Sequence, residues 1–285
     1  MPPSVAIVTD STACLDPEET DRYGIVVIPL QVLAGGRTMD DVVLREGDLA
    51  ARLREWSPIT TSRPSPEAFR RAYEEAAGRG ASGVLSIHLS AELSGTVDSA
   101  RLAAADPPIP VEVLDSRSLG MGLGFPVLAA AAAAAHGAPL TETAEAARRC
   151  MGSVHCYFYL DTLEYLRRGG RIGAAASLVG SALAIKPLLH ISNGAIAPLE
   201  KVRTATRALA RLEDLAVQAA AEDPVDVAIQ HLAALPRAED LAERLTKRIP
   251  RLNRLRLTET DLVIAAHTGP GMLGVTIAPP HPSAD

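Results

Sequence analysis

Short apolar runs alternate with longer helix-like segments along the first half of the chain. Each apolar run has the length of a buried strand, and the segments between them space their apolar residues like helices that face a core. The predicted strands are residues 5–8, 25–30, 84–89 and 111–114. The predicted helices are residues 66–80, 96–105, 124–136 and 140–151. Because this alternation is typical of parallel sheets with crossover helices, we expect an α/β domain with a mainly parallel sheet.

The pattern changes after about residue 155. Residues 186–191 and 196–202 flank Asn193-Gly194, a pair that favours the positive φ angles of a tight β-hairpin. The other predicted strands are residues 157–160, 225–230, a run around 255 and 262–265, and the predicted helices are residues 204–221 and 236–248. We therefore expect a second α/β domain with a mixed or antiparallel sheet and packed helices. The predicted domains are residues 1–155 and 156–285, with the last strand a candidate to return to the first domain.

Composition narrows the classes of protein. The 285 residues suffice for about two domains, and 47% hydrophobic residues indicate a globular chain. The net charge of −6 disfavours a nucleic-acid partner. The apolar runs are too short for a membrane span and the N-terminus lacks the layout of a signal peptide, so we expect a cytoplasmic protein.

The same composition bears on ligand chemistry. The three cysteines have no metal-ligand spacing, and neither a Walker loop nor a Gly-x-Gly-x-x-Gly turn follows a predicted strand, so we expect no metal and no cofactor. Aromatic residues make up only 3% of the chain. Pockets must therefore be lined chiefly by aliphatic side chains, which suit a flexible aliphatic ligand.

Polar side chains gather where predicted strands end. Ser94-Gly95-Thr96 lies between an apolar run and a predicted helix, where backbone N–H groups and two hydroxyls can face one anion, although such residues are more often simple helix caps. Similar loops follow two other strands, at Thr9-Asp10-Ser11 and Asp115-Ser116. Ligands of open parallel sheets bind outside the carboxyl ends of the strands, so these loops are predicted to lie along one edge.

Three further segments are candidates for ligand contact. Thr61 to Pro66 is a hydroxyl-rich entry to a helix, and its simpler interpretation is again a cap. His267 to Gly271 follows the apolar run predicted as a strand, and its Gly-Pro-Gly turn would allow close ligand approach. Arg167 to Arg171 combines glycines with arginines and fits either a solvated helix end or a forked donor for a carboxylate or phosphate.

Taken in chain order, these segments resemble the DegV family of bacterial fatty-acid-binding proteins. The matching segments are Asp10-Ser11-Thr12, Thr61 to Pro66, Leu93 to Thr96, Asp115-Ser116, Asp161 to Ile172, Ile185-Lys186-Pro187, Lys201-Val202-Arg203 and His267 to Gly271. Each is short, but together they span nearly the whole chain. Arg63, Val97 and Cys14 depart from the residues that are commoner in the family.

The resemblance implies a two-domain protein that holds one long-chain fatty acid between its domains. It places the carboxylate at Thr61, Ser94 and His267, with Gly95 and Thr96 in the same turn. It places Ser62, Asp10, Ser11, Arg171 and Arg203 near the head group or at a partner contact. The implied partner is a separate fatty-acid kinase that forms acyl phosphate, with transient contact at a membrane surface for lipid exchange.

Two other classes of function compete with lipid binding. Ser94 as nucleophile and His267 as base would make an acyl hydrolase or acyltransferase, although the sequence identifies no acid to orient the histidine and no Gly-x-Ser-x-Gly turn. The anion turn would also suit a small phosphate- or sugar-binding module.

Overall fold

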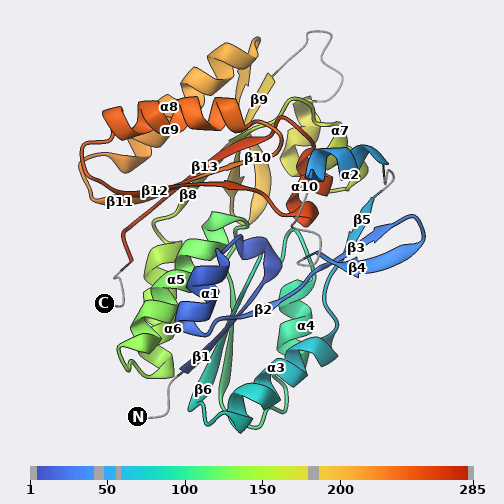
Figure 1. The fold of residues 1–285 in the computed structure, drawn as a ribbon, viewed down its shortest axis with the longest axis vertical. Helices are drawn as coiled ribbons and strands as arrows, with labels where there is room; N and C mark the ends of the chain where they lie inside the picture. The colour runs from blue at the N-terminus through green and yellow to red at the C-terminus, as the bar shows by residue number, and fades with distance from the viewer. Residues whose placement is uncertain (1–4, 42–47, 56–58, 179–185, 282–285) are drawn as a thin grey trace.

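The computed structural model describes residues 5–41, 48–55, 59–178 and 186–281. These residues form two α/β halves, one above the other in Figure 1. The predicted fold class is confirmed, because one half has a parallel sheet and the other a mixed sheet with helices.

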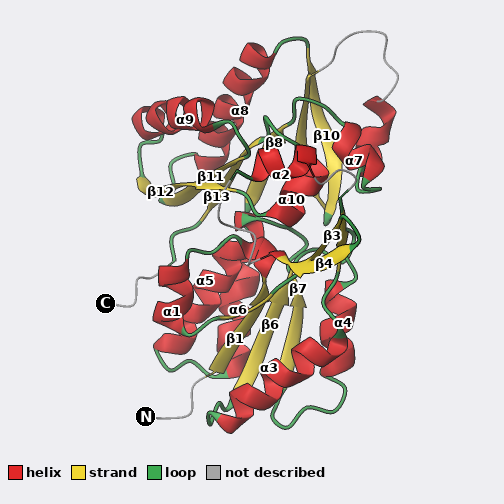
Figure 2. Ribbon diagram, turned by 45° about the vertical axis from the view of Figure 1, so that its right-hand side comes forward, coloured by secondary structure: helices red, strands yellow, loops and turns green. Residues whose placement is uncertain are grey.

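The sheet of the first half has four parallel strands in the order β2-β1-β6-β7. Their bounds are β1 Val5–Asp10, β2 Val26–Ile28, β6 Gly83–His88 and β7 Val111–Asp115. On one face lie α3 Pro66–Gly78 and α4 Thr96–Ala103, and on the other α1 Pro17–Tyr23, α5 Met121–Ala135 and α6 Leu140–Met151 (Figure 2). Apolar side chains fill both faces, so the strands carry almost continuous apolar runs.

The sheet of the second half has six strands in the order β10-β9-β8-β13-β11-β12, and only the β11–β12 pair is parallel. Their bounds are β8 His155–Tyr159, β9 Lys186–Ser192, β10 Ala195–Val202, β11 Val225–His231, β12 Leu252–Glu259 and β13 Leu273–Ala278. Helices α8 Ala205–Ala220 and α9 Leu235–Arg248 cover one face. The predicted hairpin is confirmed, with φ of 52° at Asn193 and 85° at Gly194.

The prediction of a strand at residues 262–265 is wrong, because this run lies in helix α10, Leu262–Thr268. The side chain of Asp261 caps the helix by accepting the Ile264 N–H at 2.7 Å. A short apolar run fits a buried helix as well as a buried strand, so the pattern alone did not separate the two. The last strand, β13, was not predicted, and it pairs with β8 and β11 rather than joining the sheet of the first half.

A small three-stranded sheet, also not predicted, connects the two halves. Its order is β4-β3-β5, formed by β3 Gln31–Ala34, β4 Arg37–Asp40 and β5 Thr60–Ser62. The β3–β4 hairpin projects from the body of the protein, with α2 Leu49–Glu55 close by (Figure 1). Because Val32 pairs with Thr61, the hairpin fixes the position of the strand that carries this threonine.

Asp10, at the end of β1, is fully buried and accepts hydrogen bonds from several groups. Its Oδ1 accepts the backbone N–H of Thr12 at 3.1 Å and the Thr12 hydroxyl at 2.5 Å, and its Oδ2 accepts the Leu89 N–H at 2.9 Å. His88 Nδ1 lies 3.1 Å from the same Oδ2. This carboxyl group therefore ties the ends of β1 and β6 together.

Replacing Asp10 with Ala is expected to lower the free energy of unfolding by about 3 kcal/mol or more, because buried donors lose their acceptor. Asp98→Ala is the control, since Asp98 is exposed and lies 3.8 Å from Arg101 in a surface pair. Its effect should stay below about 1 kcal/mol. Urea titration of both variants makes the comparison, and equal losses would contradict a structural role for Asp10.

Candidate functional site

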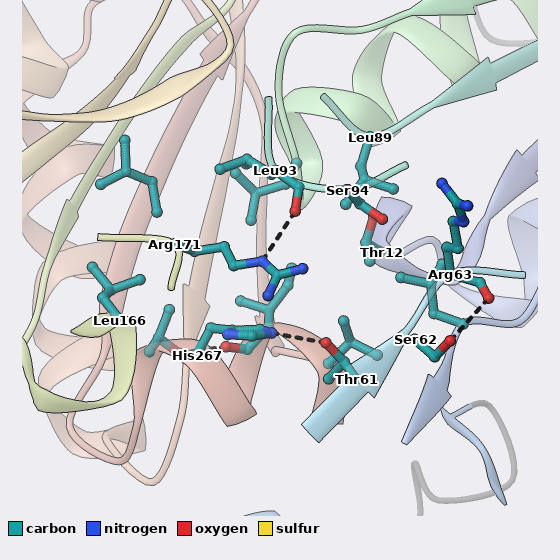
Figure 3. Close-up of a pocket in the computed structure, with 16 residues that line it drawn as sticks. Thr12, Thr61, Ser62, Arg63, Leu89, Leu93, Ser94, Leu166, Arg171 and His267 are labelled. Carbon is teal, nitrogen blue, oxygen red and sulfur yellow. Dashed lines mark hydrogen bonds between the residues drawn. The ribbon is translucent and has the colours of Figure 1, made fainter. Parts of the chain in front are cut away.

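A hollow between the two halves is lined by side chains from both (Figure 3). One group of lining residues is polar: Thr12, Thr61, Ser62, Arg63, Ser94, Arg171, His267 and Thr268. The other group is aliphatic: Leu30, Leu89, Leu93, Leu119, Leu166, Ile196, Val263 and Ile264. The hollow therefore combines a cluster of hydrogen-bonding groups with an apolar wall.

Thr61 and His267 meet across the boundary between the halves. The Thr61 Oγ1 lies 2.9 Å from His267 Nε2, with the threonine on β5 and the histidine in the last turn of α10. His267 Nδ1 is buried without a hydrogen-bond partner among the described residues. A buried N–H without an acceptor costs more free energy than a buried nitrogen that carries no proton. The neutral ring therefore carries its proton on Nε2, which donates a hydrogen bond to Thr61.

Ser94 lies at the start of α4, as predicted for an anion turn. Its hydroxyl is 2.9 Å from that of Thr96, and Gly95 occupies the N-cap position of the helix. A Cβ on Gly95 would lie 2.0 Å from Nη1 of Arg63, so this arginine lies directly over the turn. A hydroxyl, a helix N-terminus and a guanidinium thus lie close together at this turn.

Arg171 reaches from the second half toward the first. Its Nε donates to the Leu93 carbonyl oxygen at 3.1 Å and its Nη1 to that of Gly169 at 2.7 Å. In Figure 3 the guanidinium points into the space between Ser94 and His267. This places a fixed positive charge beside the hydroxyls.

The electrostatic state of His267 follows from its surroundings. Burial lowers its pKa from 6.5 to about 4, and the positive charge of Arg171 contributes in the same direction. The ring is therefore neutral at pH 7 and acts as a hydrogen-bond donor rather than a cation. Gly169 makes room for it, since a Cβ there would lie 2.1 Å from His267 Nδ1.

The geometry does not assemble a nucleophile and base from Ser94 and His267. The serine hydroxyl pairs with Thr96 and the histidine Nε2 with Thr61. No described carboxylate accepts from His267 Nδ1, the position where an orienting acid would sit.

The remaining candidate residues have different surroundings. Asp10 and the Ser11 hydroxyl, which accepts the Leu30 N–H at 2.9 Å, bind neighbouring backbone and do not line the hollow. Thr12, from the same motif, does line it. Arg203 is exposed and lies outside the lining, so its contact with a partner stays a prediction.

A second hollow continues from the first toward the interior of the second half. The two share Leu119, Ile196, Ile264 and Thr268, and the second extends to the ends of β11 and β13. They have volumes of about 60 Å³ and about 50 Å³. Since one water molecule needs about 10–15 Å³ of such space, each hollow has room for only a few waters, and a long ligand would need the shared aliphatic side chains to move aside.

A third hollow, of about 270 Å³, lies on the other side of Thr61, Arg171 and His267. Tyr165 and the exposed Arg168 also line it, so the polar cluster is accessible from the protein surface. In the described part of the chain, no group of three side chains could hold a metal ion. No helix there is long and apolar enough to cross a bilayer.

Fold and site together define a class: two-part α/β proteins with a narrow pocket between the halves that has an aliphatic wall and a hydrogen-bonding cluster at its mouth. A family model described as "uncharacterised protein, DegV family" matches residues 4–280. The chain belongs to the DegV family.

Individual relatives agree with this assignment. A DegV domain-containing protein of Streptomyces coelicolor is 51% identical over 275 residues, covering 96% of this chain and 98% of its own. A DegV family protein of Thermus thermophilus, whose structure is described as fatty acid binding, has a TM-score of 0.90 at 32% identity over 97% of this chain and 100% of its own. DegV of Bacillus subtilis, described as a fatty acid binding protein, has a TM-score of 0.87 at 32% identity over 97% and 99%.

The lowered pKa of His267 predicts a pH dependence of stability. Between pH 6.5 and about pH 4 the unfolded chain binds a proton at this ring that the folded chain does not. Stability is therefore lost as the pH falls through this window, by about 3 kcal/mol from this residue, and is unaffected by it above the window. Urea titrations across the window should show a smaller loss in His267→Gln, and identical pH dependences in variant and parent would contradict the assignment.

Proposed function

We propose that this protein binds one long-chain fatty acid between its two halves and presents the carboxylate to a separate kinase that forms acyl phosphate. The observation that carries the proposal is the polarity of the pocket between the halves, which has a largely aliphatic wall and a cluster of hydrogen-bond donors at its mouth. Relatives described as fatty acid binding, with TM-scores of 0.90 and 0.87, support the ligand class.

The polar cluster suits a carboxylate. Because the Thr61 oxygen accepts from His267 Nε2–H, its own hydroxyl proton is free to donate to the ligand. Ser94 supplies a second hydroxyl from across the hollow, and Arg171 a fixed positive charge. A carboxylate offers several acceptor sites to these donors, and such charge-assisted hydrogen bonds are stronger than neutral ones.

The aliphatic wall would supply most of the affinity. At about 0.8 kcal/mol per buried methylene, a tail of about 14 methylenes could contribute on the order of 10 kcal/mol before the costs of binding. Each hydrogen bond to a charged acceptor adds about 1.5–3 kcal/mol. The tail therefore sets affinity, and Thr61, Ser94 and His267 orient the head group.

Presentation to a kinase is supported by the third hollow. It gives a path from the surface to Thr61, Arg171 and His267 without passing along the aliphatic wall. A partner could reach the carboxylate there while the tail stays buried, and Arg171 would face the phosphate as it forms. In this proposal the protein supplies no catalysis or cofactor of its own and exchanges lipid by transient contact with a membrane surface.

The bound ligand is the first test. Native mass spectrometry of the purified protein is expected to show one long-chain fatty acid per chain, whereas a phosphorylated metabolite or a sugar would contradict the proposal. Thr61→Val should weaken binding of an added fatty acid about tenfold, since one charge-assisted hydrogen bond is lost. Thr60→Val is the matched control, because Thr60 borders only the third hollow and lines neither of the two hollows with aliphatic walls.

Product formation is the second test. With ATP and a bacterial fatty-acid kinase catalytic subunit, the parent protein should support acyl phosphate synthesis. Ser94→Ala is expected to reduce this rate more than it reduces lipid capture, because the tail dominates affinity and the hydroxyl orients the head group. Equal and near-total loss of lipid in Ser94→Ala would contradict that division. Hydrolysis of an acyl ester by the protein alone, abolished in Ser94→Ala, would favour the hydrolase.

A further inference from the structure

The inner end of the pocket is not apolar. Gln230 and Thr260 line the second hollow and are only 5% and 2% exposed. Gln230 Nε2 and Thr260 Oγ1 are each buried without a hydrogen-bond partner among the described residues. We propose that these two groups bind an oxygen atom near the far end of the acyl chain, so that the preferred ligand is a fatty acid with a distal hydroxyl or keto group; this inference rests on the proposed function.

The amide of Gln230 is fixed in one orientation. Its Oε1 accepts the backbone N–H of Met121 at 2.9 Å, a bond that only the oxygen of the amide can make. A Cβ on Gly120 would lie 2.5 Å from the same oxygen, so the side chain is packed closely against the start of α5. With the oxygen engaged, the Nε2 hydrogens are the groups left for a ligand.

Thr260 is held by its backbone rather than by its side chain. Its N–H donates to the His231 carbonyl oxygen at 2.9 Å, at the end of β12 and just before α10. Its hydroxyl has no hydrogen bond to any described residue and can act as donor or acceptor. It therefore adapts to a ligand hydroxyl or to a keto oxygen.

Thr268 and Cys156, which also line this hollow, already have hydrogen-bond partners. The Thr268 hydroxyl donates to the Ile264 carbonyl oxygen at 2.9 Å. Cys156 Sγ lies 3.4 Å from the Ser118 hydroxyl and 3.6 Å from that of Thr276, and burial raises the pKa of its thiol, so it is neutral. Gln230 and Thr260 thus remain as two uncharged groups that suit a neutral oxygen rather than a second carboxylate.

This arrangement discriminates against a plain methyl end. A hydrocarbon placed against Gln230 Nε2 and Thr260 Oγ1 excludes water from two buried polar groups without replacing its hydrogen bonds. Sites built to bind a hydroxyl reject the analogue that lacks it more strongly than apolar pockets reject an added hydroxyl. The pocket is therefore expected to bind the acyl chain with a distal oxygen more tightly than the plain chain.

The test compares saturated fatty acids of increasing length, each with and without a hydroxyl at the methyl end, by titration calorimetry. At the best-fitting length the hydroxylated acid is expected to bind about tenfold more tightly than the plain acid. Thr260→Val, which keeps the shape of the side chain, should abolish this preference. Gln230→Leu is not a suitable variant, because it would also remove the acceptor of the Met121 N–H.

Thr258→Val is the matched control. Its hydroxyl is also buried without a hydrogen-bond partner among the described residues, and Thr258 lies on β12 two residues before Thr260, but it does not line the hollow, so the preference should be retained. An isomer with its hydroxyl next to the carboxyl group should gain nothing. This inference would be overturned, and the proposed function left intact, if the plain acid bound as tightly as the hydroxylated acid or more tightly, and if Thr260→Val did not change this ratio. Failure of every acid to bind would overturn both.

Discussion

The hydrogen bond between Thr61 and His267 is the contact on which the site depends, because its two residues come from different halves of the molecule. The 2.9 Å contact forms only when β5 and α10 lie side by side. Arg171 makes a second link across the boundary, donating to the Leu93 carbonyl oxygen. The cluster at the mouth of the pocket is therefore a product of how the halves pack, and neither half contains it alone.

Other hydrogen bonds hold the elements around the Thr61–His267 contact in place. Cys14 Sγ lies 3.2 Å from Asp261 Oδ2, while Oδ1 of the same aspartate caps α10, so the loop after β1 is connected to the helix that carries His267. On the opposite side, Asp10 holds Thr12 and Leu89 at the ends of β1 and β6. Thr12 and Leu89, two of the lining residues of the first half, are thus held by one buried carboxyl group.

The sequence predicted the parallel sheet and the hydroxyl-rich strand ends because both depend on local patterns. It failed where the outcome depends on tertiary packing. The run that contains Ile264 is a helix, since the Asp261 cap and the neighbouring elements decided between two conformations that the pattern allowed. The strands around Val32 are too short to give a periodic signal. No sequence pattern indicated a role for Gln230, because a single glutamine in an apolar strand does not show which group its oxygen binds or that its Nε2 is without a partner among the described residues.

The lining of the pocket is polar at the mouth, aliphatic in the middle and polar again at the inner end. The two ends therefore differ in the groups that they offer to a ligand. At the mouth, the hydroxyls of Thr61 and Ser94 and the charged guanidinium of Arg171 line the hollow, and the neutral His267 adds no second buried cation. At the inner end, Gln230 Nε2 and Thr260 Oγ1 carry no charge, so an anion there would lose its water without a compensating charge. Under the proposed function, a ligand with a carboxylate at one end would therefore enter in a single direction. The aliphatic side chains between the ends would supply affinity, and the polar groups at each end would set its orientation.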